Sequence, residues 1–287
     1  MIKVVPVLPS GVHIHEDGLY DEHLDAVIPV NDVGKKMIEE VDGQRDMGTI
    51  VTRLDQTFSV GEERLSIDTG QLFNHLNQHY VLNYTYHGKN RGISLLLSFF
   101  MQYRKGYHER FNLSSNHFFT LLRQMMGITL RKLFIFWALF MVMDSLAYGF
   151  IPNPFFYQLA YYFTLLYGGL IVSSALHETI HVYIYRRMVP DRSGFVAADL
   201  LSIRLVRPTI SPYPFKLIWV TFLGPAIPGT MGLLGILLLQ MTTLHPTLTD
   251  SLMVISSAFA LHLMYLLPFM GDGKSVVKQI LVNRMGG

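Results

Sequence analysis

Residues 155–185 of this chain read FFYQLAYYFTLLYGGLIVSSALHETIHVYIY. Among Asp, Glu, Lys and Arg the stretch contains Glu178 alone, and it exceeds the roughly 20 residues that a helix needs to cross a bilayer. We therefore expect a membrane-spanning helix that carries a polar group, His177-Glu-Thr-Ile-His181, close to its end.

Three more apolar stretches of this kind occur at about residues 133–151, 217–241 and 252–270. Half of the 287 residues are apolar and only 15% are charged, which is more apolar than an average soluble domain. We predict a mainly α-helical polytopic membrane protein with about four transmembrane helices.

Charge placement predicts the orientation of these helices. The loops at residues 152–154 and 242–251 contain no lysine or arginine, whereas the opposite ends of the apolar stretches are basic. The positive-inside rule then places both termini in the cytoplasm, and the first residues lack the layout of a signal peptide. We expect a multi-pass protein of a bacterial plasma membrane, with the lipid bilayer as a partner.

A charge asymmetry divides the chain, because residues 1–90 contain 7 basic and 14 acidic residues and the remainder contains 16 and 7. Residue patterns in the acidic part predict a winged-helix-like α+β domain. Its expected elements are short strands over 12–30, helices at 31–41, 47–58 and 62–79, and a strand at 80–86.

Residues 91–132 connect this domain to the membrane domain, which we expect to cover residues 133–287. Residues 94–101 are apolar but too short to cross a bilayer. Basic residues follow them, so an interfacial amphipathic linker is the favoured interpretation.

The polar group in the second span has the spacing of a metal site. Two histidines four residues apart lie on one helix face, so His177 and His181 can bind one zinc ion, with Glu178 as the general base. A chance match is the alternative, because the motif is short. Burial in a span argues against chance, since an ionised side chain there costs at least about 2.5–3.5 kcal/mol on insertion scales.

A catalytic zinc usually needs a third protein ligand. No glutamate follows Glu178, and no third histidine extends the motif. His245 and Asp250 fall in an outer loop, and we expect His262 to pack or hydrogen-bond within the helix bundle. The absence of cysteine excludes a thiolate ligand. The remaining candidates are Asp191, Asp199 and Asp272.

Depth in the membrane favours Asp272. At 1.5 Å per residue, His177 lies about 33 Å from the start of its span and Asp272 about 30 Å from the start of its own, so both reach the cytoplasmic end. Gly271 and Gly273 allow the backbone to bend the carboxylate toward a metal. The alternative for Gly-Asp-Gly is an ordinary helix-ending turn.

The run Leu266-Leu-Pro-Phe-Met-Gly-Asp-Gly273, with the HExxH motif and the pair Gly224-Pro225, resembles the site-2 protease family of intramembrane zinc metallopeptidases. The resemblance covers about residues 133–280. It implies that Asp272 is the third ligand and that Gly224 and Pro225 bind substrate. Pro228 stands where the family has an asparagine linked to substrate handling.

Residues 194–206 predict one or two short strands. The resemblance implies a membrane-associated hairpin beside the active site, whose edge takes up an unfolded substrate as an added strand. A simple surface hairpin is the alternative.

The run Val27-Ile-Pro-Val-Asn-Asp-Val-Gly-Lys-Lys-Met-Ile-Glu-Glu-Val-Asp-Gly43 resembles the PqqD-like fold over about residues 10–88. Such domains recognise precursor peptides in ribosomal peptide natural-product pathways. The resemblance implies that a leader peptide adds to a strand edge at Asp25, Ile28 and Val30. A generic winged-helix accessory or dimerisation domain is the alternative.

These observations predict a zinc metalloendopeptidase that cleaves a small, ribosomally made precursor peptide, as the resemblance to epipeptide-type maturation proteins implies. We expect no nucleic-acid partner. Two rivals remain open: a regulatory intramembrane protease that cuts a transmembrane signalling protein, and a non-catalytic peptide-binding or immunity protein.

Overall fold

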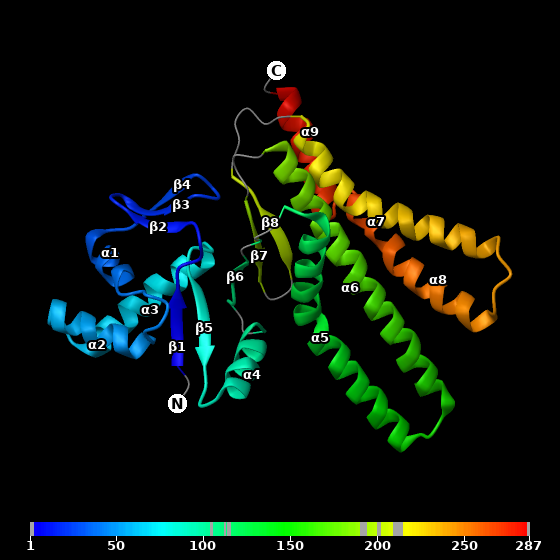
Figure 1. Ribbon diagram of the computed structural model, residues 1–287, viewed down its shortest axis with the longest axis horizontal. Helices are drawn as coiled ribbons and strands as arrows, with labels where there is room; N and C mark the ends of the chain where they lie inside the picture. The colour runs from blue at the N-terminus through cyan, green and yellow to red at the C-terminus, as the bar shows by residue number, and fades with distance from the viewer. Residues whose placement is uncertain are drawn as a thin grey trace. The chain divides into compact units, whose positions relative to one another are not determined.

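The computed structural model describes residues 3–103, 106–111, 113, 116–189, 194–199, 202–208 and 215–285. Contacts divide the chain into two compact units. Unit 1 comprises Met1–Ser114 and Asp191–Thr209, and unit 2 comprises Ser115–Pro190 and Ile210–Gly287. Their elements are labelled in Figure 1.

Unit 1 begins with four strands, three helices and a fifth strand, in the order expected for the acidic part of the chain. The antiparallel pairings are β1 with β5, and β2-β3-β4 in a separate sheet. Its first elements are β1 (Lys3–Val7), β2 (Val12–His15), β3 (Gly18–Asp21), β4 (Ala26–Pro29), α1 (Asp32–Glu39), α2 (Met47–Phe58), α3 (Glu62–Gln78) and β5 (Asn83–His87).

The helix starts in unit 1 follow from local capping. The Asn31 side chain accepts a hydrogen bond from the backbone N–H of Gly34 at 2.8 Å. The Asp46 side chain accepts one from the N–H of Thr49 at 3.1 Å. Each side chain satisfies a backbone donor that the first helical turn leaves without a partner. The three predicted helices are confirmed, and their apolar faces form one core with β2 and β3.

A further sheet in unit 1 joins segments that are far apart in sequence. Strand β6 (Glu109–Phe111) pairs with β7 (Phe195–Ala198), and β7 pairs with β8 (Ile203–Val206). The predicted hairpin over 194–206 therefore forms, although residues 200–201 at its turn lie outside the described residues. Between β5 and β6, α4 (Arg91–Met101) has no buried residue.

A buried ion pair attaches this sheet to the first part of unit 1, and a second contact of the same guanidinium lies within the sheet. The Arg110 guanidinium on β6 donates to both carboxylate oxygens of Asp21 on β3, at 2.5 and 3.1 Å, and both side chains are fully buried. The same guanidinium lies 3.9 Å from the centre of the Phe195 ring on β7. Side chains from both sequence segments of unit 1 are therefore buried together.

Unit 2 is a helix bundle in which, among the described residues, four helical stretches are long and apolar enough to cross a membrane, the fourth being Pro246–Leu281. Helix α6 packs against α5, α7 and α8, and α7 packs against α8 and α9. The elements are α5 (Phe118–Phe150), α6 (Pro154–Met188), α7 (Leu217–Gln240), α8 (Pro246–Ala260), the 3₁₀ helix η1 (Leu261–Leu266) and α9 (Gly271–Met285). This agrees with a mainly helical membrane protein.

Two helices differ from the predicted stretches at their first residues. Helix α5 begins at Phe118 rather than at residue 133. Basic residues interrupt its apolar character, yet Leu121, Met125 and Ile128 continue a buried stripe at helical spacing. Helix α8 begins at Pro246 rather than at residue 252, since proline is favoured in a first helical turn.

Candidate metal centre

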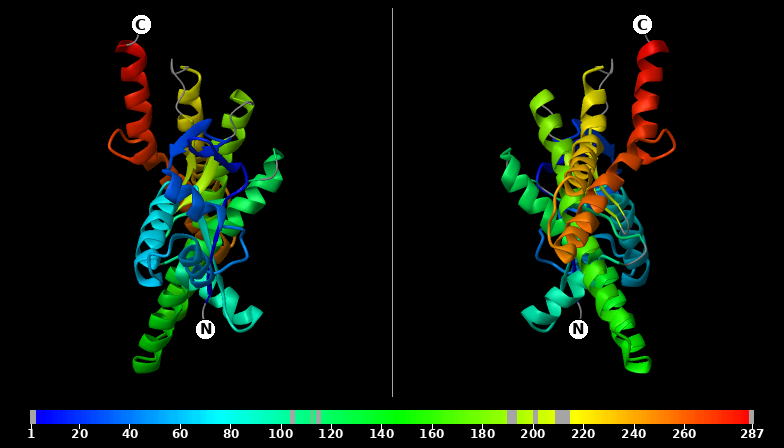
Figure 2. Two further views of the ribbon diagram at one scale, coloured as in Figure 1. Left: turned by 90° about the vertical axis from the view of Figure 1, so that its left-hand side faces the viewer. Right: turned by 90° about the vertical axis from the view of Figure 1, so that its right-hand side faces the viewer.

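Helix α6 places two imidazoles on its buried face. His177 and His181 are 5% and 8% exposed, and their Nε2 atoms are 2.8 Å apart. The spacing of four residues puts the rings one above the other along the helix, as the sequence predicts. Residues farther along α6 are basic, and this end of the bundle also carries the start of α7 and the helix α9 (Figure 2).

Asp272 reaches the two histidines from the first turn of α9. Its Oδ2 lies 3.0 Å from Nε2 of His177, and its Oδ1 lies 3.7 Å from Nε2 of His181. A break after η1 allows the chain to turn here, and Gly273 is required by the turn. A Cβ at Gly273 would stand 2.1 Å from the carbonyl oxygen of Leu267.

The three side chains form a group that could hold a metal ion. One ligand atom from each of His177, His181 and Asp272 lies within 4.8 Å of the other two. Tetrahedral ligands with bonds of about 2.0–2.2 Å stand about 3.3–3.5 Å apart. The separations between these ligand atoms are 2.8, 3.0 and 3.7 Å and bracket that value, so the donor set fits a metal with small adjustments.

The orientation of the His181 ring is set by helix α7. Its Nδ1 lies 2.7 Å from the carbonyl oxygen of Val220. Since a carbonyl only accepts, Nδ1 carries the proton, and Nε2 of the neutral ring keeps its lone pair for the group. Gly224 permits this approach, because a Cβ there would lie 2.2 Å from Cε1 of His181. Pro225, also predicted as a substrate residue, follows Gly224 within α7 and is buried.

The His177 ring is contacted from η1. Its Nδ1 lies 3.0 Å from Nδ1 of His262, whose Nε2 lies 3.0 Å from Oγ of Ser173. His262 is 4% exposed. The expectation that His262 hydrogen-bonds within the bundle is confirmed. Its direct contact with His177 was not predicted. Helical periodicity does not show that His262 lies in a 3₁₀ helix, η1, and contacts α6.

Glu178 follows His177 on α6 and is partly buried. It interacts electrostatically with His177, His181 and Asp272. The predicted general base is therefore next in sequence to one predicted ligand and within electrostatic range of all three. A carboxylate in that position can exchange a proton with a group bound there.

Two of the other acidic residues considered as ligands, Asp199 and Asp250, have separate partners in the structure. Asp199 accepts from the backbone N–H and the hydroxyl of Ser202. Asp250 lies in α8, 3.5 Å from the hydroxyl of Tyr162. His245 precedes α8, and Asp191 lies outside the described residues.

The residues predicted for peptide binding belong to unit 1, whereas the metal group belongs to unit 2. Asp25 is exposed, precedes β4 with φ of 51°, and accepts from the Tyr20 hydroxyl at 3.1 Å. Ile28 and Val30 are partly buried and pack on the domain core. Strand β4 is an outer strand of its sheet.

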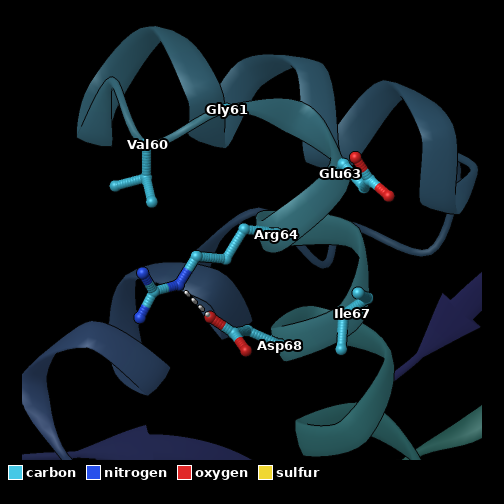
Figure 3. A pocket seen from close by; sticks show the side chains of 6 residues that line it. All are labelled: Val60, Gly61, Glu63, Arg64, Ile67 and Asp68. Carbon is cyan, nitrogen blue, oxygen red and sulfur yellow. Dashed lines mark ion pairs between the residues drawn. The ribbon is translucent and has the colours of Figure 1, made fainter.

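A hollow in unit 1 lies between the end of α2 and the first turns of α3 (Figure 3). All of its lining side chains are exposed, and the charged pair Arg64 and Asp68 is 3.9 Å apart. It contains none of the predicted site residues. We interpret it as a surface feature of the helix junction.

Comparisons with family models, with curated proteins and with solved structures found no match to the chain. The geometry of the metal group therefore carries the functional argument.

Proposed function

We propose that this chain is a membrane-embedded zinc metallopeptidase. The observation that carries the proposal is the convergence of two imidazole nitrogens and a carboxylate oxygen within 4.8 Å, in a bundle of apolar helices. Imidazole and carboxylate ligands suit zinc, and three protein ligands are typical of catalytic zinc sites. His177, His181 and Asp272 would hold the ion.

Zinc at this position would polarise a peptide carbonyl and lower the pKa of water. Glu178 would take the proton from the attacking water as the water oxygen bonds to the carbonyl carbon. As the C–N bond breaks, Glu178 passes that proton to the leaving amine. Helix α6 would thus supply two of the three metal ligands and the proton carrier.

The proposed substrate is a small precursor peptide recruited by unit 1. Support comes from β4, an outer strand with Ala26, Val27 and Pro29 exposed while Ile28 packs on the core. An outer strand offers backbone hydrogen-bonding groups to an added peptide strand, and exposed alternate side chains give specificity.

Replacing Glu178 tests the catalytic proposal. The purified full chain is incubated with zinc and fluorescently labelled, unfolded casein. We expect E178Q to cleave at least about 100-fold more slowly, since a positioned general base contributes typically 10²–10⁴-fold. Zinc content should match wild type, because Glu178 is not a ligand.

E63Q is the matched control, since Glu63 is an exposed residue of α3. It should cleave casein at the wild-type rate. Equal cleavage by E178Q and wild type would refute Glu178 as the base. If neither protein released fragments while both bound peptide, a non-catalytic binding protein would be the better description.

Recruitment is tested with V27D, which adds a charge to the exposed face of β4. With a precursor peptide encoded by a neighbouring gene, V27D should slow cleavage, whereas casein cleavage should remain unchanged. Slower cleavage of both substrates would instead indicate a structural defect.

A further inference from the structure

We propose that His262 is a positioning residue that fixes the tautomer of His177, so that Nε2 of His177 is ready to bind the metal. The inference rests on the proposed zinc function. Its evidence is a buried chain of contacts that runs from His177 through His262 to Ser173, with both links at 3.0 Å. All three residues are no more than 5% exposed.

The direction of every hydrogen bond in this chain follows from its far end. The Ser173 hydroxyl lies 3.3 Å from the carbonyl oxygen of Leu170, and we assign its single proton to this bond because a carbonyl can only accept. Ser173 must then accept from Nε2–H of His262. A neutral His262 protonated at Nε2 has a lone pair at Nδ1.

That lone pair faces Nδ1 of His177, which must donate to it. The neutral His177 ring consequently carries its proton on Nδ1 and its lone pair on Nε2, the atom beside Asp272 and His181. The carbonyl of Leu170 thereby sets the protonation pattern of a ligand two residues away in the hydrogen-bond chain. Metal-binding histidines are commonly oriented by such outer partners.

The rings of His181 and His177 are oriented by different hydrogen-bond partners. His181 donates directly to the carbonyl of Val220 on the neighbouring α7. His177 is oriented indirectly. His262 bridges it to Ser173, which lies one turn earlier on the same helix. Tyr265 stacks on His262 with ring centres 5.6 Å apart and planes at 22°, which limits rotation of the bridging ring.

His262 also links two segments of the site. It lies in η1, ten residues before Asp272 along the same segment, and contacts α6 through both ring nitrogens. The same residue therefore prepares one ligand and restrains the segment that delivers another. A packing role alone would need neither nitrogen.

The test compares H262L with H262Q in the full-length protein, and the probe is zinc alone. Leucine fills the space without a hydrogen bond. Glutamine can accept from His177 through its oxygen and donate to Ser173 through its nitrogen. We expect zinc affinity, measured by competition with a chromophoric chelator, to fall about 10–100-fold in H262L. H262Q should recover most of that loss.

Thermal unfolding of the metal-free variants separates positioning from packing, because positioning predicts similar unfolding temperatures for H262L and H262Q despite different zinc affinities. S173A should weaken zinc binding less than H262L does, in the same direction. S257A is its matched control, since Ser257 donates to Met253 within α8 and touches neither ring.

Equal zinc affinity in H262L and wild type would overturn the inference, as would H262Q binding as weakly as H262L. Casein cleavage is measured separately. Wild type that binds zinc without cleaving casein would refute the proposed peptidase and leave the role of His262 supported by its binding data. Wild type that binds no zinc would overturn both.

Discussion

Both units bury ionisable side chains, and they do so in opposite ways. In unit 1, Arg110 and Asp21 are fully buried and pair two donors with two acceptors. In unit 2, His177, His181 and Asp272 direct three acceptor atoms at one another. A pair of opposite charges satisfies itself, whereas converging acceptors require a cation or protons between them.

The difference separates a structural contact from a binding site. The presence of a charged residue does not distinguish the two groups, because each contains an aspartate beside buried partners. The distinguishing property is the match between donors and acceptors. On that criterion, the Asp21–Arg110 pair is a self-satisfied structural contact, whereas the group in unit 2 could hold a metal ion.

Breaking the Asp21–Arg110 pair should have the largest effect. Replacing Arg110 with methionine leaves a buried carboxylate without its partner, which costs about 3–5 kcal/mol in the free energy of unfolding. Chemical denaturation of the full chain measures this. Zinc affinity should not change.

The double variant Arg110→Met with Asp21→Leu is the control. Apolar replacement of both partners is commonly neutral or stabilising, so the double variant should recover most of the lost stability. If the double variant remained as unstable as Arg110→Met, the Asp21–Arg110 pair would contribute more to stability than the pairing of its own two charges.

Removing Asp272 should come next. D272A deletes a proposed ligand, so zinc affinity should fall by more than about 100-fold, beyond the loss typical of an outer partner. The same change at Asp250, which contacts Tyr162 in α8, should leave affinity unaltered. Zinc binding by D272A at wild-type strength would remove Asp272 from the ligand set.

A methyl group at Gly224 tests the packing behind His181. In G224A the added Cβ would meet the imidazole 2.2 Å from Cε1, and such overpacking costs typically about 1–3 kcal/mol. Displacing the ring should weaken zinc binding. G168A is the control on α6, where nothing lies within 4 Å of an added Cβ, and it should bind zinc normally.

The smallest expected effect on stability is at Asp46. Its negatively charged side chain caps helix α2 and accepts hydrogen bonds. The N–H of Thr49, and secondarily Lys3, lower the pKa of the Asp46 carboxyl. Its stabilising contribution is therefore complete above the ordinary aspartate pKa of about 3.9 and is lost as pH falls through the lower folded value. D46A should cost about 1 kcal/mol at neutral pH.

D46N keeps the accepting oxygen without the charge. It should retain most of the stability of wild type at neutral pH and lose part of the stabilisation that disappears on acidification. An unchanged acid response in D46N would assign that response to other carboxyl groups. Denaturant titrations at several pH values measure both variants.

Helices were the most predictable part of the fold. Asn31 and the apolar periodicity after it were sufficient to predict α1 and its start, because capping is local. The early start of α5 was missed, since hydropathy falls at Arg123 and Arg131 while the buried face continues. A hydropathy threshold detects helical segments that contact lipid, and it misses helical turns that pack against other protein segments.

The site was partly predictable for a similar reason. The spacing of His177 and His181 is a local property of one helix. The depth argument that favoured Asp272 assumed one continuous helix over residues 252–270, whereas the structure has α8, η1 and a break before α9. The contact between His262 and His177 depends on the tighter 3₁₀ turn of η1 and on the break before α9. Neither has a distinct signature in the sequence, so the bridging histidine could be found only in three dimensions.

The pairing of β6 with β7 has a consequence for rearranging the protein by genetic means. Since unit 1 takes residues from both Met1–Ser114 and Asp191–Thr209, the chain crosses between the units three times. Removing residues 1–90 would leave Arg110 without its partner Asp21 and would expose Phe195. A functional graft would have to carry the hairpin as well, so the portable module is discontinuous in the gene.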